Sequence, residues 1–61
     1  MKKHYRDFYG YDAVIRELPN GKWRVRVYAF NGYTKTCETF GAAKMALRAI
    51  SHGWREVDRV G

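Results

Sequence analysis

Hydrophobic and polar residues alternate through the middle of the chain, most clearly in GKWRVRVYAF, residues 21–30. Apolar side chains take the odd positions from Trp23 to Ala29, and the even positions carry three cations and Tyr28. Because successive side chains of a strand point to opposite faces, this pattern predicts a strand with one apolar face and one cationic face. The apolar face is expected to pack on the core, so the cationic face is the one that needs a functional explanation.

A hairpin is predicted before this strand. Residues 19–21, Pro-Asn-Gly, suit a three-residue loop in which the glycine takes the left-handed conformation. This loop pairs Ile15 with Val25 on the apolar face, and Ala13 with Val27 two residues further along. A two-residue closure would shift the register by one and turn every side chain to the other face, so the three-residue loop is the better prediction.

A second hairpin is predicted after the strand. Asn31-Gly32 suits a two-residue turn of the primed type, which matches the twist of a hairpin and pairs Tyr28 with Lys35. The same register places Cys37 on the cationic face. The chain would thus form a meander of three antiparallel strands, at about residues 11–18, 22–30 and 33–39.

The hydrophobic period then changes to that of a helix. Apolar residues recur at helical spacing from Ala43 to Ile50, which predicts a helix over residues 40–52. Thr39 or Gly41 can cap its start, and Gly53 suits a left-handed stop. The side chains expected to be buried together are Trp23, Val25, Val27, Leu47 and Ile50.

The expected fold is therefore a single α+β domain over residues 1–61. A three-stranded antiparallel sheet at residues 11–39 packs on one helix in the C-terminal half. Residues 1–10 are expected to form a basic aromatic arm ahead of the sheet. Residues 54–60 alternate less clearly, which predicts a short fourth strand or a strap over an open edge.

Charge is concentrated in the first half of the chain. Twelve Lys and Arg against six Asp and Glu give a net charge of +6, and residues 1–35 alone hold eight cations against three acids, a net +5. Such a field indicates a polyanionic partner or an acidic patch on a protein. The single cysteine, the absence of an apolar run after the first residues and the lack of a span-length apolar stretch predict a cytoplasmic protein without a disulfide, signal peptide or membrane contact.

The expected partner site is the cationic sheet face, with the arm beside it. Arginine donates to phosphate and to guanine edges, tyrosine stacks on bases, and a narrow sheet can enter a major groove. An exposed strand rich in Lys and Arg is also common without any partner, and a basic arm can be a frayed terminus. The residues assigned to binding are Arg16, Lys22, Arg24, Arg26, Tyr28, Tyr33 and Lys35 on the sheet, and Lys2, Lys3 and Arg6 on the arm.

A resemblance supports this reading. GKWRVRVYAFNGYTKTCETFGAAKMAL resembles the N-terminal arm-binding domains of phage and transposon tyrosine integrases, which are similar to the plant Apetala-type DNA-binding domain. The matching positions are Gly21, Trp23, Val25, Arg26, Val27, Lys35, Thr39, Phe40 and Ala46. The resemblance implies three strands on one helix, with the sheet in the major groove of duplex DNA. The sequence departs from the family where Ala42, Ala43 and Lys44 replace an early acidic helix residue, and no integrase catalytic domain follows.

A second hypothesis keeps the same residues and changes the partner. The order of strands and helix, ending in the Gly-aromatic segment that begins at Gly53-Trp54, is similar to small early phage proteins that bind host RNA polymerase. The basic face would then dock on an acidic surface of a host enzyme, as a host-takeover inhibitor. The two histidines and Cys37 are scattered and lack metal-ligand spacing, and no catalytic constellation is present. We therefore expect no enzyme activity, no metal, no cofactor and no small-molecule substrate.

Overall fold

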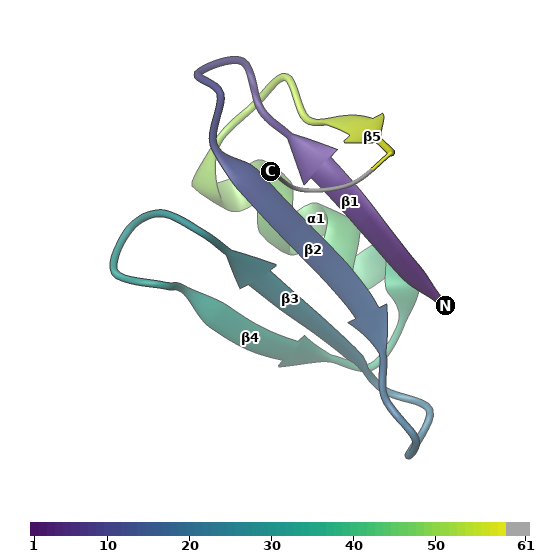
Figure 1. The fold of residues 1–61 in the computed structure, drawn as a ribbon. Coiled ribbons are helices and arrows are strands. Elements are labelled where there is room, and N and C mark those ends of the chain that lie inside the picture. Colours follow the sequence, from purple (N-terminus) through teal and green to yellow (C-terminus); the bar gives the residue numbers. More distant parts are fainter. Residues whose placement is uncertain (59–61) are drawn as a thin grey trace.

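The structure, a computed structural model that describes residues 1–58, is an α+β fold with one helix and one antiparallel sheet (Figure 1). The strand order is β4-β3-β2-β1-β5, so four strands form a meander and β5 adds to the free edge of β1. The α+β prediction is confirmed, but the prediction of three strands is wrong, because the sheet has five. The elements are β1 (Lys2–Arg6), β2 (Asp12–Glu17), β3 (Trp23–Val27), β4 (Thr34–Cys37), α1 (Phe40–Ile50) and β5 (Arg55–Val57).

The N-terminal residues form a strand inside the sheet, so the prediction of an arm over residues 1–10 is wrong. Strand β1 hydrogen-bonds to β2 on one edge and to β5 on the other. Of its five side chains only Tyr5 is apolar and buried, and this hides the strand in the sequence. The predicted short strand within residues 54–60 is present as β5, while residues 59 and 60 lie outside the described part of the chain.

The first hairpin has the predicted register. Ile15 pairs with Val25 and Ala13 pairs with Val27. The loop closes where the Leu18 amide donates to the Lys22 carbonyl at 2.7 Å, and Gly21 has a φ of +85°. Turn chemistry and side-chain parity agree here, which is why the sequence was sufficient.

The tight turn of the second hairpin lies one residue earlier than predicted, and the strand pairing is shifted by three residues. The Ala29 carbonyl accepts from the Gly32 amide at 3.0 Å, and the two central residues, Phe30 and Asn31, have φ of 53° and 63°. The predicted pairing of Tyr28 with Lys35 is therefore wrong. Lys35 pairs with Val25 instead.

The new register turns every side chain of β4 to the opposite face. It buries Cys37 against the helix and sends Thr34 and Thr36 to the other side. The predicted position of Cys37 on the cationic face is therefore wrong as well. Burying a thiol in place of a hydroxyl avoids an unsatisfied polar group, which is a physical reason for the observed register.

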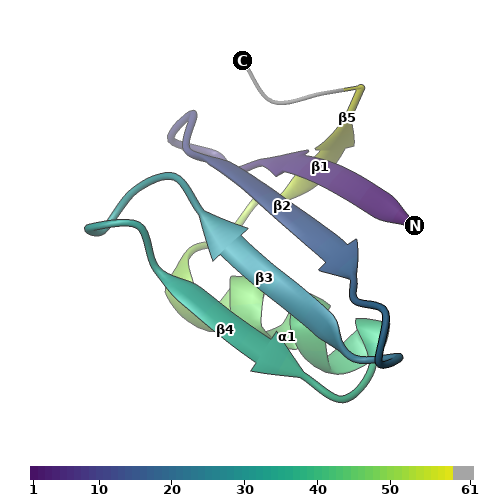
Figure 2. The same ribbon diagram turned by 60° about the horizontal axis from the view of Figure 1, so that its bottom comes forward.

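One face of the sheet forms the core with the helix, and Figure 2 shows the other face uncovered. Helix α1 contacts β2, β3 and β4. It begins at the N-cap Thr39, whose Oγ1 accepts from the Ala42 amide at 3.0 Å. The helix ends at Ile50, before the predicted residue 52, because Ser51 is extended.

The core contains most of the side chains that the sequence predicted. Fully buried positions include Ile15, Val25, Val27 and Leu47, each of which contributes about 1.5–3 kcal/mol by leaving water. Trp23 and Ile50 are only partly buried and pack at the margin of this cluster. The faces of β2 and β3 are therefore as expected.

Candidate nucleic-acid interface

The uncovered side of the sheet, here called the open face, is strongly cationic. Directly opposed residues of antiparallel strands share a face, so the pairing defines its members. Of twelve strand positions, six are Lys or Arg and one is acidic. The twelve positions of the open face are Lys2, His4 and Arg6 of β1, Asp12, Val14 and Arg16 of β2, Arg24 and Arg26 of β3, Thr34 and Thr36 of β4, and Arg55 and Val57 of β5.

Three cations stand in one row across β1, β2 and β3, at the end of the open face where β1 begins. Lys2 is paired directly with Arg16, and Arg16 is paired directly with Arg24. Like charges at directly opposed positions destabilise a sheet, and a mixed pair would stabilise it. All three residues are exposed, so burial gives no compensation. The row therefore concentrates positive charge at a cost in stability, which is the pattern expected of a binding site.

A shallow hollow of about 100 Å³ lies beside this row. Val14 forms its floor and is buried although it lies on the open face. The stems of long cationic side chains cover such an apolar floor while their charged ends stay in water. The Arg26 guanidinium lies 5.4 Å from the centre of the Tyr28 ring, a cation–π distance. The hollow is lined by Lys2, Val14, Arg16, Arg24, Arg26 and Tyr28.

One cation of the open face is already neutralised. Arg6 Nε donates to Asp12 Oδ1 at 2.7 Å, and this hydrogen bond, with the carboxylate charge, raises the pKa of the guanidinium. Arg55 pairs with Arg6 on the neighbouring strand and was missed from the sequence. The weak alternation of residues 54–60 was the available signal. It could not assign Arg55 to a face of the sheet, because that assignment depends on the pairing of β5 with β1.

Four predicted site residues lie elsewhere. Lys3, on the helix side of β1, binds Glu56 at 2.8 Å, which raises the pKa of the Lys3 ammonium. Lys22 lies 3.4 Å from Glu38 at the end of the sheet. Tyr33 packs against the core and Lys35 pairs with Val25, so their predicted place on the open face is wrong. The predicted residues that the structure brings together are Lys2, Arg6, Arg16, Arg24, Arg26 and Tyr28.

A group of exposed aromatic rings, here called the aromatic tip, lies at one end of the sheet. Figure 1 shows that the β1–β2 and β3–β4 loops are both at this end. The rings of the tip are those of Phe8, Tyr9, Tyr11, Phe30 and His52. Neighbouring rings form a connected series. The ring centroids are 5.2 Å apart between Phe30 and Tyr11, 6.4 Å apart between Tyr11 and Tyr9, and 5.7 Å apart between Tyr9 and His52. This group was not predicted from the sequence, although the run FYGY at residues 8–11 marks it.

A buried carboxylate holds the β1–β2 loop in place. Asp7 is 1% exposed, and its Oδ1 accepts from the amides of Tyr9 at 2.9 Å and Tyr11 at 2.7 Å. Its Oδ2 accepts from the Ser51 hydroxyl at 2.6 Å, which ties the loop to the end of the helix. Burial raises the pKa of Asp7, but the hydrogen bonds from Ser51 and the loop amides outweigh it and leave the pKa below its usual value.

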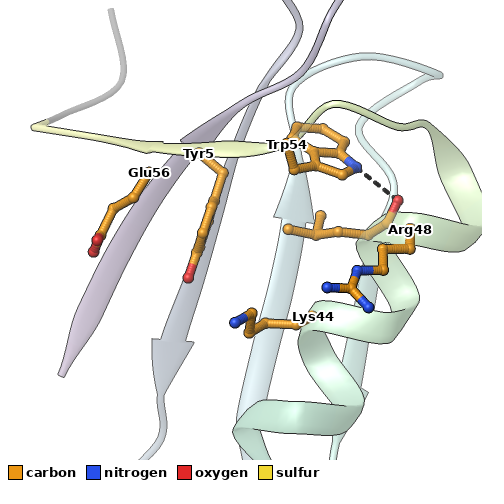
Figure 3. A pocket seen from close by; sticks show the side chains of 6 residues that line it. Tyr5, Lys44, Arg48, Trp54 and Glu56 are labelled. Atoms are coloured by element: carbon orange, nitrogen blue, oxygen red, sulfur yellow. Dashed lines mark hydrogen bonds between the residues drawn. The ribbon is translucent and has the colours of Figure 1, made fainter.

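A second cationic region lies behind the sheet, in a pocket of about 270 Å³ between α1 and β5 (Figure 3). Lys44 and Arg48 extend from the helix toward Tyr5 and Glu56 on the sheet. Trp54 closes one end, where its Nε1 donates to the Leu47 carbonyl at 2.7 Å. Burial raises the pKa of the Tyr5 hydroxyl, and Glu56 adds to the effect. Because Lys44 and Arg48 face away from the open face, they provide a charge-matched control for it.

No family model matches the chain, and no curated protein or solved structure matches it either. Within residues 1–58, no group of His, Cys, Asp and Glu side chains is arranged to hold a metal ion. None of the described helices combines the length and the apolar character needed to span a membrane.

Proposed function

We propose that this protein binds nucleic acid, with the phosphate backbone lying on the open face. The observation that carries the proposal is the row formed by Lys2, Arg16 and Arg24, in which like charges oppose one another on three neighbouring strands. A polyanion relieves this repulsion, so it stabilises the folded protein on binding. Lysine and arginine donate charge-assisted hydrogen bonds to phosphate, which are stronger than neutral ones.

The width of the sheet determines how such a face meets its partner. Strands are spaced about 4.8 Å apart, so five strands span about 19 Å. A major groove is about 12 Å wide, which is too narrow for the whole face. The open face therefore suits the outside of a phosphate backbone. Contacts to phosphate position a protein but carry no sequence information, so we expect binding that tolerates many sequences.

Charge reversal on the two sides of the sheet tests the proposal. Arg16→Glu with Arg24→Glu on the open face, and Lys44→Glu with Arg48→Glu on the helix, each lower the formal net charge from +6 to +2. Fluorescence anisotropy with labelled DNA of mixed sequence gives the affinity. The open-face pair should weaken binding about a hundredfold or more, because two charge-assisted contacts are lost. The helix pair should weaken it far less. Equal losses would show that only net charge matters, and the open face would not be the site.

Salt separates nucleic acid from an acidic protein surface, the other partner that a basic face suits. With Arg6 already paired to Asp12, five open-face cations are available to phosphates. Each neutralised phosphate releases condensed counterions, so log affinity should fall against log salt with a slope of about −4.5 on duplex and about −3.5 on single strands. The wild-type protein could instead bind neither duplex nor single-stranded nucleic acid, and bind an acidic protein with a shallower salt dependence. That result would replace the proposal with docking on an acidic protein surface.

A further inference from the structure

The aromatic tip exposes more apolar surface than a small folded domain needs to leave in water. Phe8 and Tyr9 are each 66% exposed, Phe30 is 54% exposed and Tyr11 is 41% exposed. Phe8 also stacks near His52, with ring centroids 6.0 Å apart. Single exposed apolar residues are ordinary, but a contiguous group of this kind usually marks a binding surface.

The backbone of the tip is held in a fixed and partly strained conformation. Asp7 and Ser51 fasten the first loop, and the Phe8 amide donates to the His52 carbonyl at 3.1 Å. In the second loop Phe30 has a φ of 53°, a left-handed conformation that a bulky residue adopts only at a cost. The fold gains little burial from this ring, so the strain serves to present it.

We infer that the aromatic tip stacks unpaired bases of a nucleic-acid strand whose phosphates lie on the open face, an inference that rests on the proposed function. The two surfaces adjoin: Asp12 of the open face directly follows Tyr11 of the tip, and its carbonyl accepts at 2.9 Å from the amide of Tyr28, which lines the open-face hollow. One single strand supplies both partners, since its phosphates meet the cations and its free bases meet the rings. A blunt duplex keeps its bases stacked inside and offers the tip nothing. The protein should therefore prefer single strands.

The test separates base contacts from phosphate contacts. The probes are a labelled single strand of mixed sequence, a strand of equal length made of abasic sites, and a blunt duplex. The abasic strand keeps the phosphates and loses the rings. Each stacked base adds about 5- to 150-fold in affinity. Wild type should bind the ordinary strand at least tenfold more tightly than the abasic strand.

The tip variants are chosen to keep the fold. Tyr9→Ser removes an exposed ring, and Phe30→Asn puts a residue that tolerates the left-handed conformation in place of the phenylalanine. Together, the two substitutions should weaken binding to the ordinary strand about tenfold or more, and the affinity for the abasic strand should stay unchanged. Met45→Ser is the control, because Met45 is 69% exposed on the helix, outside the tip. Unfolding curves of all variants check that the fold is retained.

The outcomes distinguish this inference from the proposed function. If the tip variants bind the ordinary strand as tightly as wild type, the stacking inference is overturned, while open-face charge reversal still decides the function. If wild type binds abasic and ordinary strands equally, the tip is not a base site. If wild type binds none of the three probes, both the inference and the nucleic-acid function are wrong.

Discussion

The side of the sheet that faces the helix and the surfaces left open follow opposite rules. On the helix side, neighbouring residues such as Ile15 and Val25 are fully buried against one another. On the open face, Arg16 lies between two other cations, and at the aromatic tip Phe30 is strained and exposed. Each open feature is unfavourable in the isolated protein. Burial on the covered side therefore offsets the destabilising features of the open face and the aromatic tip, as expected where function sets the local sequence.

Truncating the covered side should have the largest effect. Ile15→Ala removes a fully buried side chain at the centre of the sheet, so it should lower the free energy of unfolding by about 3–4 kcal/mol. A domain of this size has little more to lose. Arg24→Ala on the open face should change the same quantity by less than about 0.5 kcal/mol. Thermal unfolding followed by circular dichroism measures both, and similar losses would mean that the two sides are not distinct.

The support of the aromatic tip should be the next most sensitive region. Gly53 has a φ of +75°, and a methyl group added there would meet the Phe8 Cβ at 2.8 Å. Gly53→Ala should therefore cost about 2–3 kcal/mol, from strain and from displacement of the loop. Gly21 is the matched control, since its φ is +85° but nothing lies within 4 Å. Gly21→Ala should cost only the backbone strain, about 1 kcal/mol. Equal losses in denaturant unfolding would contradict the close packing of Phe8.

Acid should act on the tip through Asp7. The pKa of Asp7 is lower in the folded protein than in the unfolded chain, so its ionised form favours folding. This contribution is present above the ordinary carboxyl pKa and is lost as the pH falls through the lower folded value. Stability of wild type should decline over that acid range, and Asp7→Asn should remove part of the decline. A variant with the wild-type pH profile would show that Asp7 is not the group responsible.

Charge reversal within the row of three cations should have a small effect on stability, of the opposite sign. Arg16→Glu places an acid between Lys2 and Arg24, so it turns two repulsive cross-strand pairs into attractive ones. The free energy of unfolding should rise by about 0.5–1 kcal/mol. The same change should weaken nucleic-acid binding, and this combination is typical of a site kept at the expense of stability. A variant that is less stable than wild type would remove the argument from charge repulsion.

Local sequence patterns predicted the position of part of the candidate site. Alternation in β3 placed Arg24 and Arg26 on one face and Val25 on the other, and the Pro-Asn-Gly loop set the pairing with β2. These predictions needed only neighbouring residues, because strand parity and turn geometry are local. The position of Arg16 beside Arg24 was therefore available before the structure, although Lys2 was not placed next to it.

Tertiary structure decided the rest, because it depended on contacts between distant residues. β1 carries one buried apolar side chain, so its strand form comes from hydrogen bonds to β2 and β5 that no local pattern shows. The register of β4 followed from burying Cys37 under the helix, which overrode the Asn-Gly turn signal. The aromatic tip required the carboxylate of Asp7 to meet the hydroxyl of Ser51, 44 residues away. By itself, the sequence determined the alternating faces, the first hairpin and the helix, whereas the five-stranded order, the row of three cations and the tip arose only when those distant groups were brought together.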